Sequence, residues 1–281
     1  MAEPTRRRFL QVAAAAFSYV PAAALGRDGA VPASDRIGLG HIGIGRRGSQ
    51  LMRGPSGSVS IAVADVYEKR FERVKGTRIA CYKDYRRLLD RKDIDAVTVG
   101  TPDHWHTACS LHAAEAGKDV YCEKPLTLTI REGRMLVEAV RRYGRVFQIG
   151  TSGRFGAARS STSRLIRKIM LSGLLKKCPA VHIQKGGFPV MRYCGIVNAV
   201  PEPVPRDLDW DMYCGPSPLR PYHHDRFGWN HRFYWDYEGG ALADFAQHYM
   251  DPFQWIYAKD HTSPVEVETF AAPAHPECCT P

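Results

Sequence analysis

Two side chains late in this sequence have the types and the spacing needed to take a proton from a hydroxyl group. Asp244 and His248 are four residues apart, so on a helix they share one face. A carboxylate beside an imidazole can hold its tautomer and raise its basicity. The same spacing is also common in plain helix-surface contacts. The pair therefore indicates a candidate base whose partners have to come from elsewhere in the chain.

A glycine-rich loop near the start indicates which partners to expect. The apolar run from Arg36 to Ile42 predicts a strand, and Gln50, Leu51 and Met52 predict the start of a helix. Between them the first glycine permits a tight bend, the second lets backbone approach a pyrophosphate, and the third allows close helix–strand packing. The loop residues are Gly43, Ile44, Gly45, Arg46, Arg47 and Gly48. This order of elements predicts a dinucleotide-binding turn.

An acid at the end of the next predicted strand bears on which dinucleotide is bound. Val59 to Val63 reads as that strand, and Asp65 follows it. A carboxylate there accepts hydrogen bonds from the adenosine ribose and repels a 2′-phosphate. Asp65 therefore favours NAD over NADP, while Arg46 and Arg47 keep NADP as the alternative.

Alternation of strands and helices continues up to Ile149. The predicted helices are 82–89, 107–116 and 130–143, and the predicted strands are 96–99, 119–122 and 146–149. Ligands of open parallel sheets bind outside the carboxyl ends of the strands. Two loops fall there and supply further cofactor contacts, namely Thr101, Pro102, His104, His106, Glu123 and Lys124. Lys124 would place a positive donor beside a nicotinamide.

These motifs together resemble the Gfo/Idh/MocA family of NAD(P)-dependent sugar oxidoreductases. The resemblance rests on the glycine loop, Asp65, the 101–104 loop, Glu123-Lys124-Pro125 and the Gly239–His248 segment. It implies an α/β fold, with a Rossmann doubly wound parallel sheet over 34–150. An α+β domain with an open, mostly antiparallel sheet should follow over 151–281. Strands of that sheet are expected at 181–188 and 265–271.

The resemblance also implies roles for the three reactive side chains. His248 would act as the base, Asp244 as its orienting partner, and Lys124 as the donor that polarises the reacting oxygen. The expected activity is hydride transfer between a tightly held nicotinamide cofactor and a sugar or cyclitol hydroxyl. The alternatives are an NAD-dependent glycoside hydrolase or lyase that oxidises its substrate transiently, and a nucleotide-binding remnant with little activity.

Aromatic and histidine-rich segments precede Asp244. Arg232, Tyr234 and Trp235 are candidates for contacts with a sugar, as are Asp244 and His248, and the alternative for the aromatic run is a core segment. His223, His224, Asp225 and His231 match no strong zinc pattern, so no metal site is predicted.

Charge and chain ends complete the expectations. The net charge of +10 is spread along predicted helices without interleaved aromatics, which predicts a solvated basic face and no nucleic-acid partner. Residues 1–30 resemble a twin-arginine export signal, because Arg6, Arg7 and Arg8 precede an Ala-rich apolar region too short to span a bilayer. This predicts a periplasmic or secreted protein with no stable membrane anchor. We expect a C-terminally truncated family member, in which the homo-oligomer of complete relatives is in doubt.

Overall fold

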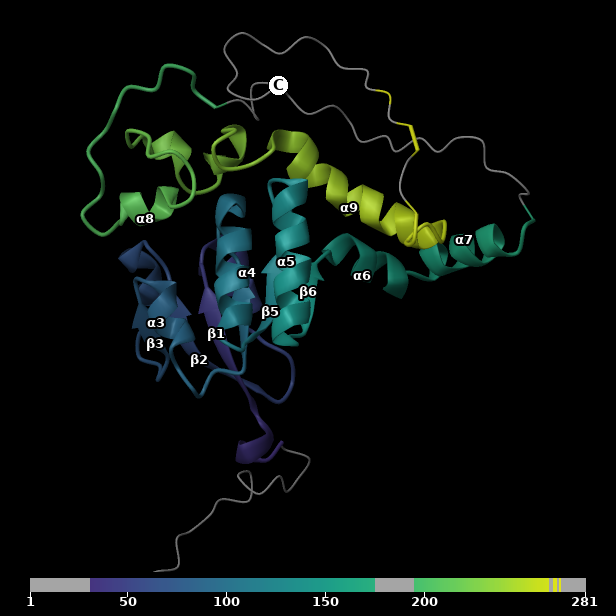
Figure 1. Ribbon diagram of the computed structural model, residues 1–281, viewed down its shortest axis with the longest axis horizontal. Helices are drawn as coiled ribbons and strands as arrows, with labels where there is room; N and C mark the ends of the chain where they lie inside the picture. Colours follow the sequence, from purple (N-terminus) through teal and green to yellow (C-terminus); the bar gives the residue numbers. More distant parts are fainter. Residues whose placement is uncertain (1–30, 175–194, 263–264, 267, 269–281) are drawn as a thin grey trace, which may run out of the picture.

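One parallel β-sheet lies in the first half of the chain. The computed structural model describes residues 31–174, 195–262, 265–266 and 268. The sheet has six strands in the order β3-β2-β1-β4-β5-β6 (Figure 1). They are β1 (Ile37–Ile42), β2 (Ser58–Ala64), β3 (Ala80–Tyr82), β4 (Ala96–Val99), β5 (Asp119–Glu123) and β6 (Phe147–Gly150). The order reverses between β1 and β4, and such switch points are where doubly wound folds bind nucleotides.

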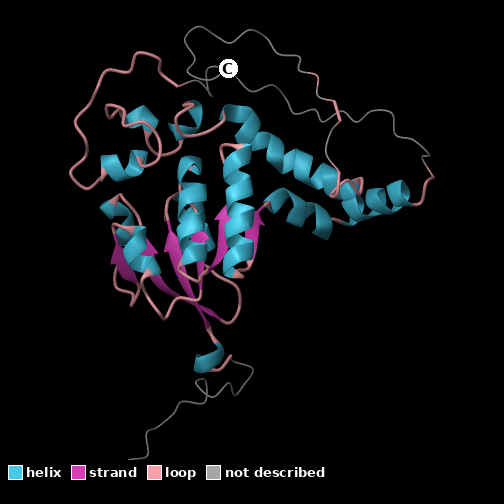
Figure 2. Cartoon of the chain, in the orientation of Figure 1, coloured by secondary structure: helices cyan, strands magenta, loops and turns pink. Residues whose placement is uncertain are grey.

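The helices of this half are short, apart from the two that lie side by side along the sheet (Figures 1 and 2). They are α2 (Arg46–Leu51), α3 (Tyr85–Leu89), α4 (His106–Glu115) and α5 (Ile130–Tyr143), with the 3₁₀ turns η3 (Ala33–Asp35), η4 (Glu68–Val74) and η5 (Asp103–Trp105). Thr129 and Glu132 form a capping box at the start of α5, and Gly144 ends that helix with a φ of +60°. Both features are standard helix-end signals.

Helices and loops make up the described part of the second half. They include α6 (Ser152–Arg159), α7 (Ser161–Leu171), α8 (Trp210–Cys214), η7 (His224–Arg226), η8 (Asn230–Phe233) and α9 (Gly240–Ile256). Gly153 lets α6 pack tightly on α9, since a Cβ there would lie 2.5 Å from the His248 carbonyl oxygen. Arg154 of α6 also donates to Asp251 of α9 over 2.8 Å. These contacts hold α9 against α6, the helix that follows β6.

One segment of the second half, residues 207–214, lies over the carboxyl ends of the strands. Its backbone pairs with the loop after β2, through Glu68 N to Asp207 O at 2.8 Å and Asp209 N to Val66 O at 2.9 Å. Its aromatic residues join a separate core cluster of Leu208, Trp210, Tyr213, Cys214, Tyr222, Phe233, Tyr234 and Tyr237. We call residues 207–214 the docking segment.

Most predicted elements of the first half are confirmed, with corrections at β3 and α2. The helix predicted over 82–89 is shorter, because Tyr82 ends a short strand and Asp84 caps a helix that begins at Tyr85. The helix after the glycine loop, α2, begins at Arg46 and ends at Leu51, whereas the sequence predicted a helix that starts at Gln50. In both places a cap or a turn, and not the apolar pattern, sets the boundary.

The antiparallel sheet expected for the second half is not found among the described residues. Residues 181–188 lie outside them, as do most of 265–271, and the predicted signal region 1–30 also lies outside. Among the helices that are described, none is long and apolar enough to cross a bilayer.

Candidate functional site

Close packing defines the glycine loop at the end of β1. Gly43 has a φ of +76°, and a Cβ there would lie 2.8 Å from the Thr101 nitrogen. A Cβ on Gly48 would lie 1.8 Å from the Gly43 carbonyl oxygen, so no other residue fits without moving the backbone. At Gly45 the nearest atom to a Cβ would be 3.6 Å away, on Arg70. The loop is thus packed on its inner side and more open at its middle glycine, as backbone approach to a pyrophosphate requires.

Arg47 ties this loop to the Glu-Lys-Pro segment. Its Nε donates to Glu123 Oε1 over 2.7 Å. The Glu123 side chain is only 8% exposed, whereas that of Arg47 is 43% exposed. Glu123 therefore acts as an anchor between the ends of β1 and β5, and Lys124 follows directly after it.

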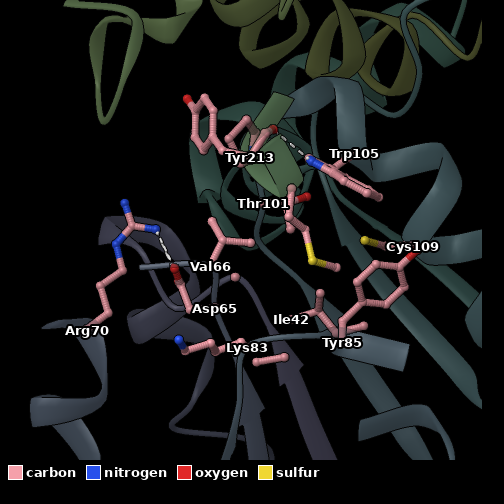
Figure 3. A pocket seen from close by; sticks show the side chains of 14 residues that line it. Ile42, Asp65, Val66, Arg70, Lys83, Tyr85, Thr101, Trp105, Cys109 and Tyr213 are labelled. Carbon is pink, nitrogen blue, oxygen red and sulfur yellow. Dashed lines mark hydrogen bonds and ion pairs between the residues drawn. The ribbon is translucent and has the colours of Figure 1, made fainter. Parts of the chain in front are cut away.

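Asp65 lies at the end of β2 and is held by the protein itself. Its Oδ2 accepts from Ile44 N at 2.9 Å, and its Oδ1 accepts from Tyr67 N at 2.9 Å. Arg70 Nη1 donates to both oxygens at 3.0 Å (Figure 3). These contacts occupy most of the acceptor capacity of the carboxylate. The predicted ribose acceptor is therefore paired with an arginine that the sequence analysis did not single out.

A pocket beside this pair brings several predicted cofactor residues together. Figure 3 shows its labelled side chains, which come from β1, residues 65–70, residues 83–85, the 101–105 loop, α4 and the docking segment. The predicted residues in its lining are Gly43, Asp65, Thr101 and Pro102. Met212 and Tyr213 of the docking segment complete the wall. Its place between the ends of β1, β2 and β4 fits the adenosine half of a dinucleotide.

His104 and His106 serve as backbone anchors in this structure. His104 Nε2 donates to the Tyr213 carbonyl oxygen over 2.8 Å, and Trp105 Nε1 donates to the same oxygen over 2.9 Å. The ring nitrogens of His106 face the carbonyl oxygens of Pro125 and Thr101. Burial lowers the pKa of both histidines to about 4, so both are neutral near pH 7, and His106 donates to only one of its two carbonyl oxygens. They position the 101–105 loop, the docking segment and the Lys124 turn relative to one another.

Lys124 and Asp244 form a buried ion pair between the two halves. Lys124 Nζ donates to Asp244 Oδ1, and also to the Asp244 carbonyl oxygen at 3.0 Å. The two side chains are 10% and 6% exposed. On the other side, Arg232 Nε lies 3.3 Å from Asp244 Oδ2. Two cations thus share one carboxylate, although 120 residues separate Lys124 from Asp244.

His248 lies one helical turn further along α9 and within electrostatic reach of this pair. Partial burial lowers its pKa below the ordinary 6.5, and the positive charge of Lys124 lowers it further. No hydrogen bond joins Asp244 to His248 in the part of the chain that the structure describes. Asp244 therefore does not orient His248 in this structure, because its two carboxylate oxygens face Lys124 and Arg232.

The predicted substrate contacts separate into buried and exposed residues. Tyr234 is only 2% exposed, and its hydroxyl donates to Asp225 at 2.7 Å and accepts from Ile196 N at 3.1 Å. It is a core residue, which was the alternative for that aromatic run. Arg232 is turned toward Asp244 and stacks on Trp229 at 4.3 Å. Trp235 is 56% exposed and remains available to a ligand.

The histidine-rich segment does not gather as one group. Both oxygens of Glu202 accept from His224, through its backbone nitrogen at 3.0 Å and its Nδ1 at 2.8 Å. His231 instead donates from Nδ1 to the Gly228 carbonyl oxygen at 2.6 Å and faces Glu238. Sequence reasoning missed Arg70, Asp103 and Glu238. Asp103 stands inside a loop already singled out, whereas no motif marked the other two.

Two models of one protein family match nearly all of the described chain. The one described as "Oxidoreductase family, NAD-binding Rossmann fold" (Gfo/Idh/MocA) matches residues 37–151. The one described as "Oxidoreductase family, C-terminal alpha/beta domain" of the same family matches residues 159–281. The boundary between them falls just after β6.

Individual relatives match over less than half of their own length. An inositol 2-dehydrogenase/D-chiro-inositol 3-dehydrogenase of Shouchella clausii is 36% identical over 166 residues, 56% of this chain and 44% of that protein. The scyllo-inositol 2-dehydrogenase (NAD⁺) of Bacillus subtilis is 32% identical over 133 residues, 46% of this chain and 38% of that protein. The crystal structure of a myo-inositol 2-dehydrogenase from Lactobacillus plantarum is 26% identical with a TM-score of 0.45, covering 50% of this chain and 43% of that one. The chain spans less than half of the length of these relatives.

Proposed function

Since the chain belongs to the Gfo/Idh/MocA family of NAD-binding oxidoreductases, we propose that it transfers a hydride between a nicotinamide cofactor and a secondary hydroxyl of a cyclitol or sugar. The substrate class follows the names of the relatives, which act on inositols. The chemistry follows from Lys124 at the carboxyl end of β5 and from Asp244 and His248 on α9.

The observation that carries this proposal is the buried Lys124–Asp244 pair beside His248. An ammonium group has three donors, and the two described contacts of Lys124 Nζ both go to Asp244. One donor is left for a substrate oxygen. Asp244 keeps the ammonium group aimed and compensates its charge, which burial would otherwise penalise.

His248 supplies the base in this scheme. Because burial and Lys124 lower its pKa, the imidazole is neutral near pH 7 and can take the hydroxyl proton. When bound, a nicotinamide cofactor accepts or returns the hydride. Lys124 donates to the same oxygen, so it stabilises the negative charge that develops as the proton leaves.

The residues of the glycine loop and the adjoining pocket fit such a cofactor. Gly43, Gly45 and Gly48 would accommodate the pyrophosphate, and the Asp65 carboxylate would face the adenosine ribose. We propose NAD as the preferred cofactor, on the strength of the Asp65 carboxylate. The Arg70 pair weakens that preference, since it neutralises the charge that would repel a 2′-phosphate.

A substrate panel tests the proposal. The purified protein is mixed with NAD⁺ and single cyclitols or sugars, and nicotinamide reduction is followed by absorbance. We expect reduction with at least one secondary alcohol, and loss of that signal in His248→Asn at unchanged nucleotide affinity. A protein that binds NAD⁺ but reduces it with no cyclitol or sugar would refute the assignment.

We also propose export by the twin-arginine route. The proposal is supported by Arg6, Arg7 and Arg8 ahead of the apolar region that ends at Leu25. Residues 1–30 fused to a reporter should carry it across the bacterial inner membrane, and replacing the three arginines by lysine should stop this. Retention of the unmodified fusion in the cytoplasm would argue against it.

A further inference from the structure

A second group of buried polar side chains lies behind the Lys124–Asp244 pair and has no role in the scheme above. Asp103 of η5 is 3% exposed, His231 of η8 is 5% exposed, and Glu238 in the turn before α9 is 1% exposed. One oxygen or nitrogen atom from each of the three side chains lies within 4.8 Å of the other two. Two segments more than 120 residues apart thus bring acidic groups together in the interior.

These side chains face one another with acceptors only. Asp103 Oδ2, both Glu238 oxygens and His231 Nε2 are buried without a hydrogen-bond partner among the described residues. The hydrogen of His231 is on Nδ1, which donates to Gly228, so Nε2 carries a lone pair. Carboxylates have no hydrogen to donate. Buried acceptors left without a donor are strongly unfavourable, so the cluster needs a proton, a cation or a donor from buried water.

The charges that face the cluster show which one fits. Three carboxyl groups meet here, those of Asp103, Glu238 and Asp244, and the facing cations are Lys124 and Arg232. The three nearby imidazoles, of His104, His106 and His231, are neutral because burial lowers the pKa of each. One negative charge is therefore in excess. A single proton balances it, whereas a divalent cation would leave one positive charge in excess beside the Arg232 guanidinium.

Glu238 is the group best placed to hold that proton. Its side chain is fully buried, and Arg232 Nε lies closer to Asp244 Oδ2, at 3.3 Å, than to Glu238 Oε2, at 3.7 Å. Burial raises the pKa of both Asp103 and Glu238. For Glu238 the charges of Asp103 and Asp244 raise the pKa further and outweigh the lowering effect of Arg232. For Asp103 the lowering effect of Arg232 is the largest after burial.

We propose that Glu238 stays protonated, donates a hydrogen bond to Asp103, and thereby positions Arg232 on Asp244 and Asp244 on Lys124. An ionised Glu238 would compete with Asp244 for the same guanidinium. A neutral one leaves Arg232 to Asp244, whose other oxygen then stays on Lys124. Glu238 is thus a positioning residue for hydride transfer. This role rests on the function proposed above, whereas the protonation of Glu238 does not.

Infrared difference spectroscopy tests the protonation without any turnover. The spectrum of the wild-type protein minus that of Glu238→Gln, between pH 6 and pH 8, should contain the carbonyl band of a protonated carboxyl group. Glu202→Gln is the matched control, because Glu202 is partly exposed and hydrogen-bonded to His224, and it should lose only carboxylate bands. A carboxylate band for Glu238 would overturn the proposal, whether or not the protein oxidises a cyclitol.

Proton release on unfolding gives a second test. The pKa of Glu238 is raised in the folded protein, so its contribution to stability is complete below the ordinary glutamate pKa of 4.5 and is lost as pH rises toward the folded value. The unfolding equilibrium constant of the wild type should therefore rise, relative to that of Glu238→Gln, by up to about tenfold per pH unit over this window. An unchanged ratio would contradict a buried proton at Glu238.

Rescue by the conservative variant tests the positioning role. Glutamine is neutral and can still donate to Asp103, so Glu238→Gln should keep kcat within about threefold, whereas Glu238→Ala should lower it at least tenfold. Equal loss in both variants would refute the role. Stoichiometric metal in the wild type that is lost in Glu238→Gln would refute the proton and establish a cation site.

Discussion

Asp244 shows which contacts of a residue could be predicted from the sequence and which could not. Its spacing from His248 was visible, and the shared helix is confirmed by α9. Its actual partners, Lys124 and Arg232, were not predictable as a pair, because one comes from the end of β5 and the other from a 3₁₀ turn. Spacing along one helix identifies which side chains share a face, but not which neighbour from another element reaches them first.

Loss of the Lys124 ammonium group should remove most catalysis. We expect Lys124→Ala to lower kcat by about 10²- to 10⁴-fold, the range for a positioned proton donor. The affinity for the nucleotide should change little, because the glycine loop, and not Lys124, is the proposed site of the pyrophosphate. Steady-state kinetics and nucleotide titration measure the two effects separately. A near-normal kcat in this variant would show that Lys124 does not contact the reacting oxygen.

The pH profile should report His248. The imidazole acts in its neutral form, so kcat/KM for alcohol oxidation should fall as pH decreases through its pKa. Burial lowers that pKa below 6.5, so the acid limb should lie below the ordinary histidine value. His248→Asn should lack the limb and most of the activity. An acid limb above pH 6.5 that persists in the variant would assign it to another group.

Arg70 should set the strength of the cofactor preference. Arg70→Ala leaves Asp65 ionised without its partner, so NADP binding should weaken relative to NAD by about tenfold, the scale of one charge-assisted hydrogen bond. Asp65→Asn should narrow the preference instead, while keeping a polar group for Ile44 N and Tyr67 N. Dissociation constants for both nucleotides test this. Identical ratios in the two variants would disprove the electrostatic explanation.

Elements with strong local signals were predicted well, and weakly marked ones were not. The helix α5 begins with a capping box and ends at a glycine in the left-handed region, and its predicted bounds were correct. The strand β3 has only three residues, too few for a pattern of alternation, so it was not predicted and its last residue, Tyr82, was assigned to the helix that follows. The cluster around Glu238 combines side chains from η5, η8 and the turn before α9. No local sequence pattern could indicate it, because its members are distant in the chain.

The glycine loop gives a prediction at this scale. Gly48→Ala places a Cβ 1.8 Å from the Gly43 carbonyl oxygen, so the loop has to shift and nucleotide affinity should fall at least about tenfold. Gly156→Ala is the matched control, since a Cβ there meets nothing within 4 Å and alanine favours the helix α6. Calorimetric titration with NAD⁺ compares them. Equal affinities would mean that the loop does not hold the pyrophosphate.

The two halves of the molecule meet where the chemistry is placed. The docking segment covers the pocket proposed for adenosine through Tyr213, and α9 brings Asp244 and His248 to the Lys124 side. The sheet that carries the glycine loop could be predicted from periodicity and turns. The manner in which the second half closes over it could not, because backbone contacts such as those of Val66 and Glu68 leave no mark on side-chain patterns.

Isotope transfer tests the central claim most directly. A cyclitol oxidised by the protein is prepared with deuterium on its reacting carbon and incubated with NAD⁺, and the cofactor is analysed by mass spectrometry. Direct hydride transfer predicts one deuterium per reduced nicotinamide in the wild type, and essentially no reduced cofactor in Lys124→Ala or His248→Asn. Reduced cofactor without deuterium, or reduction undiminished in both variants, would contradict the account.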